Sequence, residues 1–331
     1  MSVHGLVIGK FMPPHQGHVH LFDFAQQVAD SLTIVVERIE GEPIDSAVRV
    51  RWVQELAPRA RVMHLDQHMP QQPTERPDFW PHWRSTLRTL VDRPVQLVFA
   101  SEAYGQRLAT ELGARFVPVD PLRSAVSVSA TAVRQDPHAV WHHLPAPVRA
   151  HYTRRIAVVG PESAGKTTLS RQLARALSGT WVPEYARTLL EHTSSPEADW
   201  PATLTRIARG QAAQEAALAR QSAGVLVCDT DLLTTRIWWE RLVGPPPAWL
   251  LSLADRATYD LTVLCAPDLA WEHDPIRYLP EAQAWFFDRF ETELARLGRR
   301  VHIARGPHRL EAAQRAWHDA VHSATPPPPP I

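Results

Sequence analysis

Residues of the types that bind phosphate gather in the middle of the chain, in the turn GPESAGKT from Gly160 to Thr167. The turn satisfies the pattern G-x-x-x-x-G-K-[ST] of a phosphate-binding loop. Its glycines let successive backbone N–H groups point inward at an anion, Lys166 adds a positive charge, and the Thr167 hydroxyl can ligate Mg²⁺. A chance glycine turn is the alternative, but the flanking strand and helix patterns favour the phosphate loop. The expected ATP contacts are Gly160, Glu162, Ser163, Ala164, Gly165, Lys166, Thr167 and Thr168.

Two histidines near the N-terminus, His15 and His18, lie three residues apart where a helical pattern begins. Imidazoles at the N-terminal end of a helix are well placed to bind a phosphate group. Since the chain has 17 histidines, a pair of surface histidines is the alternative interpretation. The surrounding residues argue against it, because Gly9 to His18 reads GKFMPPHQGH between a strand pattern and a helix pattern.

A serine, a threonine and an arginine form a third group in the segment VSATAVR, from Val128 to Arg134. Ser129 or Thr131 can cap a helix, and Arg134 can pair with phosphate oxygens. On its own this segment indicates only a capped helix.

An aspartate directly after an apolar strand supplies a second Mg²⁺ contact in phosphate-loop enzymes. Asp229 follows the segment GVLVC and fits this role, although an aspartate that caps the next helix has the same sequence signal. Further on, the polar stretch from Trp271 to Pro280 contains Arg277. A lid that brings an arginine to the transferring phosphoryl group has this composition, and an ordinary loop is the other interpretation.

Two tryptophans, Trp80 and Trp83, lie in or beside a segment rich in proline and glutamine. Both could anchor the following helix in the core, or one could stack on a flat aromatic ligand. The residues alone leave both interpretations open.

The elements that must position these groups alternate between short apolar strands and amphipathic helices along the whole chain. This alternation is typical of parallel sheets covered by helices. We therefore predict an α/β fold with two parallel-sheet domains, an N-terminal Rossmann-like domain and a C-terminal P-loop domain. A connector broken by prolines ends near Tyr152, which predicts domains at residues 1–152 and 153–324 and a proline-rich tail at 325–331.

Charge and composition limit the partners of the chain. Lys plus Arg and Asp plus Glu both number 35, so no net charge attracts nucleic acid or a membrane surface. Cys228 and Cys265 fall in predicted buried strands, which favours a reducing, cytoplasmic setting. No apolar stretch approaches the ~20 residues that a membrane span needs. The sequence leaves the oligomeric state open, with a homo-oligomer among the alternatives.

Together these motifs give a specific resemblance. The pattern from Gly9 to His18 and the segment from Ser129 to Arg134 resemble the two signatures of nucleotidyltransferases, and the phosphate loop follows them. In this order they closely resemble the bifunctional NadR-like family, which joins a nicotinamide-nucleotide adenylyltransferase to a ribosylnicotinamide kinase. The resemblance extends over nearly the whole chain, apart from the tail.

The resemblance implies two reactions that both use ATP and Mg²⁺. The C-terminal domain would phosphorylate nicotinamide riboside to NMN, and the N-terminal domain would join NMN to AMP from a second ATP, giving NAD and pyrophosphate. Thr167 and Asp229 would hold the metal, and Glu184 would be either the general base or an anchor for the ribose. The implied catalytic residues are His15, His18, Lys166, Asp229, Glu184 and Arg277. The implied ligand contacts are Gly9, Lys10, Phe11, His15, His18, Ser129, Thr131 and Arg134 for ATP in the first domain, Trp80, Trp83 and Arg123 for NMN, and Glu184, Tyr185, Arg187 and Asp231 for the riboside.

The chain also departs from the family pattern. The family usually has Asn-Gly before Trp80, where this chain has Asp78-Phe79, and Pro275 replaces the usual glycine after Asp274. The first strand begins by Val3, so we expect no DNA-binding domain. The alternative functions are a transferase and kinase with other substrates, a kinase with a weak adenylyltransferase domain, and a regulatory protein that senses ATP and NAD.

Overall fold

The structure is a computed structural model that describes residues 2–192, 199–271 and 279–322. The predicted lid with Asp274, Pro275 and Arg277 lies outside the described residues, as does the proline-rich tail. No helix in the described part of the chain is long and apolar enough to cross a membrane.

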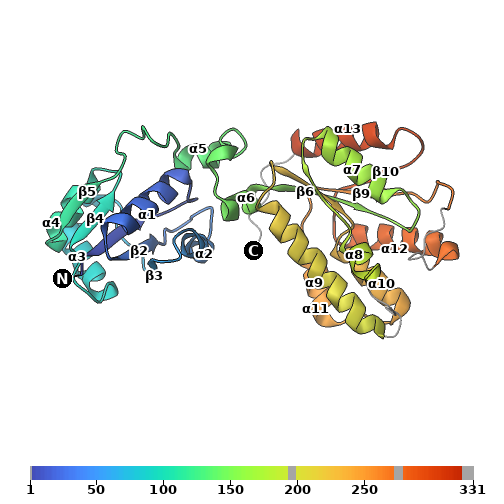
Figure 1. Cartoon of the computed structure of the whole chain (residues 1–331), viewed down its shortest axis with the longest axis horizontal. Coiled ribbons are helices and arrows are strands. Elements are labelled where there is room, and N and C mark those ends of the chain that lie inside the picture. Colours follow the sequence, from blue (N-terminus) through green and yellow to red (C-terminus); the bar gives the residue numbers. More distant parts are fainter. Residues whose placement is uncertain (1, 193–198, 272–278, 323–331) are drawn as a thin grey trace. The chain divides into compact units, whose positions relative to one another are not determined.

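The chain divides into two compact units (Figure 1). Unit 1 comprises Met1–Val148 and unit 2 comprises Arg149–Ile331, so the division falls inside helix α6 (Ala146–Tyr152). Both units are α/β folds with a parallel sheet, as the alternating strand and helix patterns predict.

Unit 1 is built on five parallel strands in the order β3-β2-β1-β4-β5. The order reverses on the two sides of β1, and sheets of this kind bind ligands at the carboxyl ends of the strands beside such a reversal. The strands are β1 (His4–Gly9), β2 (Ser31–Glu37), β3 (Arg61–Leu65), β4 (Leu97–Ala100) and β5 (Arg115–Pro118). Besides α6, the helices are α1 (Gln16–Val28), α2 (Ser46–Leu56), α3 (Phe79–Leu90), α4 (Tyr104–Leu112) and α5 (Ala130–Gln135), with short 3-10 turns η1 (Pro73–Glu75) and η2 (Trp141–His143).

Both faces of this sheet are buried, because successive apolar residues of the strands point to opposite sides. Val7 of β1 packs in a cluster with Phe22 of α1 and Val53 of α2. Leu6 packs in a second cluster with Leu108 and other residues of α3 and α4. Burying one such side chain stabilises the fold by about 1.5–3 kcal/mol. The two clusters hold β1 in place. They therefore fix the position of the loop that follows its carboxyl end.

Unit 2 has a second sheet of five parallel strands, in the order β10-β9-β6-β8-β7. The strands are β6 (Arg154–Val159), β7 (Thr180–Val182), β8 (Val225–Asp229), β9 (Leu261–Cys265) and β10 (Val301–Ala304). The helices are α7 (Lys166–Ala176), α8 (Tyr185–Leu190), α9 (Trp200–Ala219), α10 (Leu232–Leu242), α11 (Ala248–Arg256), α12 (Gln283–Arg296) and α13 (Arg309–His322), with the 3-10 turn η4 (Pro280–Ala282).

The second sheet is also covered on both faces. Val158 of β6 lies in a cluster with Leu173 of α7 and Trp317 of α13. Ala157 lies in the cluster of the opposite face, which includes Phe290 and other residues of α10 and α12. Strand β6 is therefore central and buried, and the turn that follows it starts from a fixed position.

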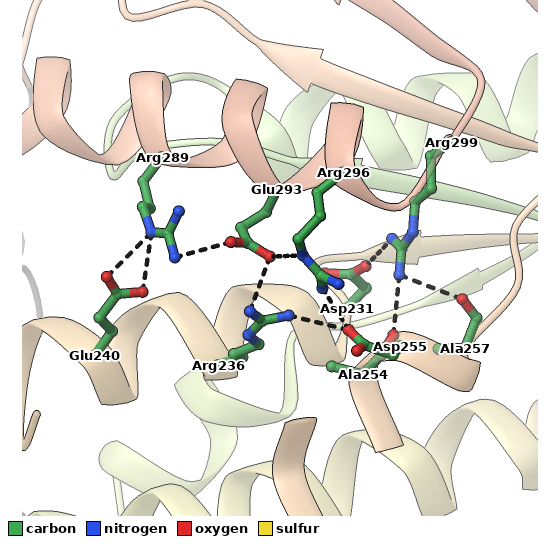
Figure 2. Close-up of polar contacts among 10 residues, drawn as sticks. All are labelled: Asp231, Arg236, Glu240, Ala254, Asp255, Ala257, Arg289, Glu293, Arg296 and Arg299. Carbon is green, nitrogen blue, oxygen red and sulfur yellow. Dashed lines mark hydrogen bonds and ion pairs between the residues drawn. The ribbon is translucent and has the colours of Figure 1, made fainter. Parts of the chain in front are cut away.

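A network of ion pairs joins α10, α11 and α12 (Figure 2). Glu293 of α12 is 3% exposed and accepts from three guanidinium groups. They belong to Arg236 at 2.9 Å, Arg289 at 2.8 Å and Arg296 at 2.8 Å. Arg236 and Arg296 also pair with Asp255 of α11, at 3.0 and 2.6 Å. The three guanidinium groups compensate the charge of the buried Glu293 carboxylate.

Two features of the fold differ from the sequence-based expectation. The patterns do not predict β3, whose five residues RVMHL carry two basic side chains and lie at the edge of the sheet. Helix α9 is predicted through Gln211 to Ala219, but it begins at Trp200, where Asp199 caps it by accepting from the Ala202 N–H at 2.9 Å.

Candidate functional site

The first site lies at the carboxyl end of β1, where Gly9 and Lys10 lead into the loop before α1. His15 directly precedes the helix, and its backbone N–H donates to Nδ1 of His18 at 3.2 Å. The two rings stack with centroids 3.8 Å apart, and Phe11 packs edge-on against His18. Because Nδ1 of a neutral His18 accepts a hydrogen bond, its ring proton lies on Nε2, from where it can be donated to a ligand.

The surroundings keep both rings neutral. Burial lowers the pKa of His15 to about 4, with smaller effects from Arg123 and His143. Burial also lowers the pKa of His18 well below its ordinary value, with smaller effects from His15 and Arg123. Nδ1 of His15 is buried and has no hydrogen-bond partner among the residues that the structure describes. A bound anion would oppose these shifts, since negative charge favours the protonated rings.

Helix α5 brings the second motif onto the same loop. The Ser129 hydroxyl caps the helix and accepts from the Ala132 N–H at 3.1 Å. Arg134 donates to the backbone oxygen of Met12 at 2.5 Å and to the Thr131 hydroxyl at 3.2 Å. The two segments, more than a hundred positions apart in the sequence, therefore meet at the end of β1.

Arg49 of α2 supports this loop, a role that its sequence context does not reveal. Its side chain is fully buried and donates to the backbone oxygens of Ile44 at 3.0 Å and Glu37 at 2.9 Å. It also bonds the backbone oxygen of Lys10 and the Glu42 carboxylate. A solvated helix arginine and a buried one give the same sequence pattern, so only the long-range contacts distinguish them.

The two predicted pyridine contacts have different surroundings. Trp83 is 7% exposed, lies in a core cluster, and donates its indole N–H to the backbone oxygen of Pro70 at 3.0 Å. Trp80 is only partly buried, with Phe79 packed edge-on and Arg107 over its ring at 5.7 Å. Of the two interpretations, Trp83 has the position of a core anchor, and Trp80 is the tryptophan with an accessible ring.

The second site is the turn between β6 and α7. Gly160, Ser163 and Gly165 have φ angles of 141°, 57° and 79°, a left-handed region that favours glycine. A Cβ atom at Gly160 would lie 2.6 Å from the backbone oxygen of the last residue of β9. Helix α7 begins at Lys166, so its N-terminal end faces the turn, and Nζ of Lys166 donates to the Pro161 oxygen at 2.7 Å. The turn has the geometry that a phosphate-binding loop requires.

Asp229 ends β8 beside this loop. Its Oδ1 atom is buried and lacks a hydrogen-bond partner within the described residues. Burial and the nearby Glu184 carboxylate raise the pKa of Asp229 to about 6, while a hydrogen bond with Thr167 and the charge of Lys166 act against this shift.

These groups fit Mg²⁺. The ion prefers oxygen ligands and keeps water and substrate phosphates in its shell, so one carboxylate and one hydroxyl are enough protein ligands. Across the described ranges, no three or more His, Cys, Asp or Glu side chains form a metal-binding group. An orphaned carboxylate oxygen beside Thr167 is therefore the feature that indicates a cation held jointly with a nucleotide.

A cavity of about 650 Å³ opens beside the phosphate loop. The loop residues from Glu162 to Thr168 line one part, and Glu184 and Arg187 contribute from the segment around the start of α8. Helices α9 and α10 add the tryptophans Trp200 and Trp238. The sequence does not identify these two tryptophans as cavity residues, because their spacing matches ordinary core positions of a helix.

Arg309, the first residue of α13, is a further residue that the sequence reasoning missed. It is 8% exposed and donates to the backbone oxygen of Ala164 in the phosphate loop at 2.6 Å. It also donates to the Ala266 oxygen at 3.2 Å and pairs with the Asp268 carboxylate. Arg309 thus ties the loop to the end of β9, across 145 positions of sequence, a distance at which no local pattern gives a signal.

Two predicted riboside contacts are not part of the cavity wall. Asp231 is fully buried, accepts from the Thr234 N–H at 3.0 Å as the cap of α10, and pairs with Arg299 at 2.5 Å (Figure 2). Tyr185 packs its ring against Gly210 of α9. Both side chains contact other residues of unit 2 and do not face the cavity. The structure therefore gives them a structural role in this unit.

The fold and the two sites define a protein of two α/β units with parallel sheets, the second of which is of the P-loop type. The family model described as AAA domain matches residues 155–310. The trifunctional NAD biosynthesis/regulator protein NadR of Salmonella typhimurium is 27% identical over 293 residues, which cover 83% of this chain and 72% of that protein. The NadR of Escherichia coli is 28% identical with the same coverage.

Solved structures agree at the level of the fold. A crystal structure of NadR in complex with NR matches with a TM-score of 0.73 at 22% identity, covering 98% of this chain and 97% of that one. A crystal structure of NadR in complex with NAD and AMP-PNP matches with a TM-score of 0.74 at 22% identity, covering 99% and 98%. The chain is therefore similar to NadR proteins in sequence and in fold.

Proposed function

We propose that this chain is a bifunctional enzyme of NAD biosynthesis. Unit 2 phosphorylates nicotinamide riboside to NMN with ATP, and unit 1 joins NMN to the AMP part of a second ATP, giving NAD and pyrophosphate. The observation that carries the proposal is the unsatisfied, buried Oδ1 of Asp229 beside the phosphate loop. The residues of this loop line a cavity of the size that holds small ligands. The names of the relatives support it, since they describe NAD biosynthesis and complexes with NR, NAD and AMP-PNP.

In the kinase reaction, the 5′-hydroxyl oxygen of the riboside attacks the γ-phosphorus of ATP, and ADP leaves. The loop N–H groups and Lys166 hold the phosphate oxygens by charge and by hydrogen bonds. Mg²⁺, held by Thr167 and Asp229, would neutralise the charge on the phosphates. Glu184 lies close enough to Asp229 to raise its pKa, and it either accepts the hydroxyl proton or anchors the ribose.

In the adenylyl transfer, a phosphate oxygen of NMN attacks the α-phosphorus of ATP, and pyrophosphate leaves. The proton on Nε2 of His18 can be donated to a developing oxyanion. Arg134 of α5 contacts the same loop through the backbone oxygen of Met12. Both groups act by position and charge, so no covalent enzyme intermediate is required.

The direct test is to incubate the protein with Mg-ATP and nicotinamide riboside and to follow riboside, NMN and NAD by chromatography. Lys166→Ala should stop NMN formation, because the charge that holds the transferring phosphates is lost. His18→Ala should let NMN accumulate without NAD. The controls Arg175→Ala and His68→Ala remove a cationic side chain and an imidazole from exposed positions and should behave as wild type.

The other outcomes separate the alternatives. NMN without NAD, even when NMN is supplied directly, would leave a kinase with a weak first unit. Binding of ATP and NAD without turnover would indicate a regulatory sensor. Turnover of other acceptors in preference to the riboside would keep the two chemistries and change the substrate.

A further inference from the structure

Helix α9 contains a glycine in an unfavourable position. Gly210 lies in the middle of the 20-residue helix, where glycine is less stable than alanine by about 1 kcal/mol. A Cβ atom there would lie 1.9 Å from Cε1 of Tyr185. Only glycine therefore leaves room for this ring, and the close approach of α8 to α9 explains the residue.

The next residue of α9, Gln211, fixes the backbone of the same tyrosine. Gln211 is 2% exposed, and its Oε1 accepts from the Tyr185 N–H at 3.0 Å. Its Nε2 donates to Oε1 of Glu215, one turn further along the helix, at 3.1 Å. Because the amide oxygen and the amide nitrogen each have a partner of the matching kind, the orientation of the amide is determined.

Glu215 is in turn held in place. It accepts from the Tyr259 hydroxyl at 2.9 Å, and Asp231 and Arg155 are the other charged groups near it. Burial raises the pKa of the Glu215 carboxyl to about 7. In such surroundings hydrogen bonds are strong and costly to lose, so the chain from Tyr259 through Glu215 to Gln211 is a firm support.

The segment that this support holds leads into the kinase site. Tyr185 directly follows Glu184, which lines the cavity and whose charge acts on Asp229. Gln214, also on α9, donates to the backbone oxygen of Pro183 at 2.5 Å, on the other side of Glu184. The backbone on both sides of Glu184 is thus bonded to one helix.

We propose that Gln211 is a positioning residue of the kinase site: by fixing Tyr185 over Gly210, it keeps Glu184 directed into the cavity. The inference rests on the proposed kinase function of unit 2. The proposal also assigns a role to α9. The side of this helix that contacts Tyr185 is continuous with the side that lines the cavity.

The test uses the full chain with Gln211→Leu, Gln211→Glu and the double variant Gln211→Glu/Glu215→Gln. Loss of the amide should lower kcat for riboside phosphorylation by about tenfold to a hundredfold, the range expected for a small misplacement, with KM for ATP unchanged. The double variant exchanges the two groups, so a carboxylate at position 211 accepts from the Tyr185 N–H and an amide at position 215 donates to that carboxylate. It should recover most of the wild-type kcat, whereas Gln211→Glu alone should not.

Four further measurements complete the test. Gln221→Leu, at an exposed position just beyond α9, is the matched control and should leave kcat unchanged. Gly210→Ala should lower kcat as Gln211→Leu does, because the added methyl group displaces the tyrosine ring. Hydrogen exchange at the Tyr185 amide should become about tenfold faster in Gln211→Leu, since this N–H loses its acceptor. Thermal unfolding confirms that each variant is folded.

The outcomes distinguish this inference from the proposed function. A wild-type kcat in Gln211→Leu, together with an inactive Lys166→Ala, would overturn the positioning role and leave the kinase assignment intact. If the wild-type chain does not phosphorylate the riboside, the proposed function fails, and exchange at Tyr185 still decides whether Gln211 holds the segment. Unchanged exchange in Gln211→Leu would refute that support.

Discussion

A single atom, Oδ1 of Asp229, gives the clearest chemical information in unit 2. A buried acceptor without a partner costs about 1–3 kcal/mol, and here a second carboxylate, Glu184, adds like-charge repulsion. A fold would gain stability by removing either group. Their presence beside Lys166 and Thr167 is explained if a cation joins them when the nucleotide binds.

Asp229→Asn tests this argument, because the amide keeps the shape of the side chain and removes its charge. We expect kcat of riboside phosphorylation to fall by about a hundredfold to a thousandfold, the range for losing one group that stabilises transition-state charge. NMN adenylylation by unit 1, measured in the same sample, should be unchanged and reports that the protein is intact. Asp288→Asn makes the same change at an exposed site and should have no effect. A loss of less than about threefold would exclude Asp229 as a metal ligand.

The lowered pKa of His15, in the first site, makes the free energy of unfolding depend on pH. Its native pKa of about 4 lies below the value of about 6.5 in the unfolded chain, so between these values only the unfolded state takes up the proton. The free energy of unfolding should therefore fall as pH decreases from 6.5 to 4, with His15 contributing on the order of 3 kcal/mol.

Urea unfolding of the wild type and of His15→Asn, at pH 7 and at pH 4.5, isolates this contribution from those of other groups. The wild type should lose more stability than the variant over this range, whereas His68→Asn, at an exposed position, should follow the wild type. Equal losses in His15→Asn and the wild type would mean that the ring is protonated in the native state as readily as in the unfolded one.

At the scale of elements, the packing of α10, α11 and α12 depends on Glu293 (Figure 2). Replacing it by glutamine leaves three arginines without their shared carboxylate, and the side chain of Arg236 is only 10% exposed. Each arginine keeps a second carboxylate, Asp255 or Glu240, so no buried charge is left unpaired. Because losing a hydrogen bond between charged groups costs about 1.5–3 kcal/mol, we expect Glu293→Gln to lower the free energy of unfolding by this amount in urea denaturation at pH 7. Glu291→Gln, exposed on the same helix, should change it by less than about 0.5 kcal/mol, and equal effects of the two changes would assign the network no net stability.

The sequence predicts elements whose information is local and does not predict the residues that support them from a distance. The turn between β6 and α7 is predicted because its information is local: a strand, two glycines with positive φ, and the Lys-Thr pair are contiguous. Supporting residues such as Arg309, Arg49 and Gln211 are not predicted, because their partners lie 145, 39 and 26 positions away. Local patterns also cannot distinguish a core tryptophan from a stacking one. The deeper burial of Trp83 and its bond to Pro70 separate it from Trp80.

At the scale of the whole molecule, each unit has its own sheet, its own buried clusters and its own candidate site. The product of the proposed kinase, NMN, is the substrate of the proposed adenylyltransferase. Among the residues that the structure describes, those named for each site belong to a single unit, so damage to one site should leave the other chemistry intact.

Mixing two defective proteins tests this separation. Lys166→Ala should adenylylate supplied NMN at the wild-type rate, and His18→Ala should phosphorylate riboside at the wild-type rate. Together they should convert riboside to NAD, with a lag during which NMN accumulates in solution, because NMN made by one protein must diffuse to the other. The lag should shorten as the protein concentrations rise. If each variant retains its remaining activity but the mixture forms no NAD, the transfer of NMN requires both working sites in one chain, and the units cannot be treated as independent catalysts.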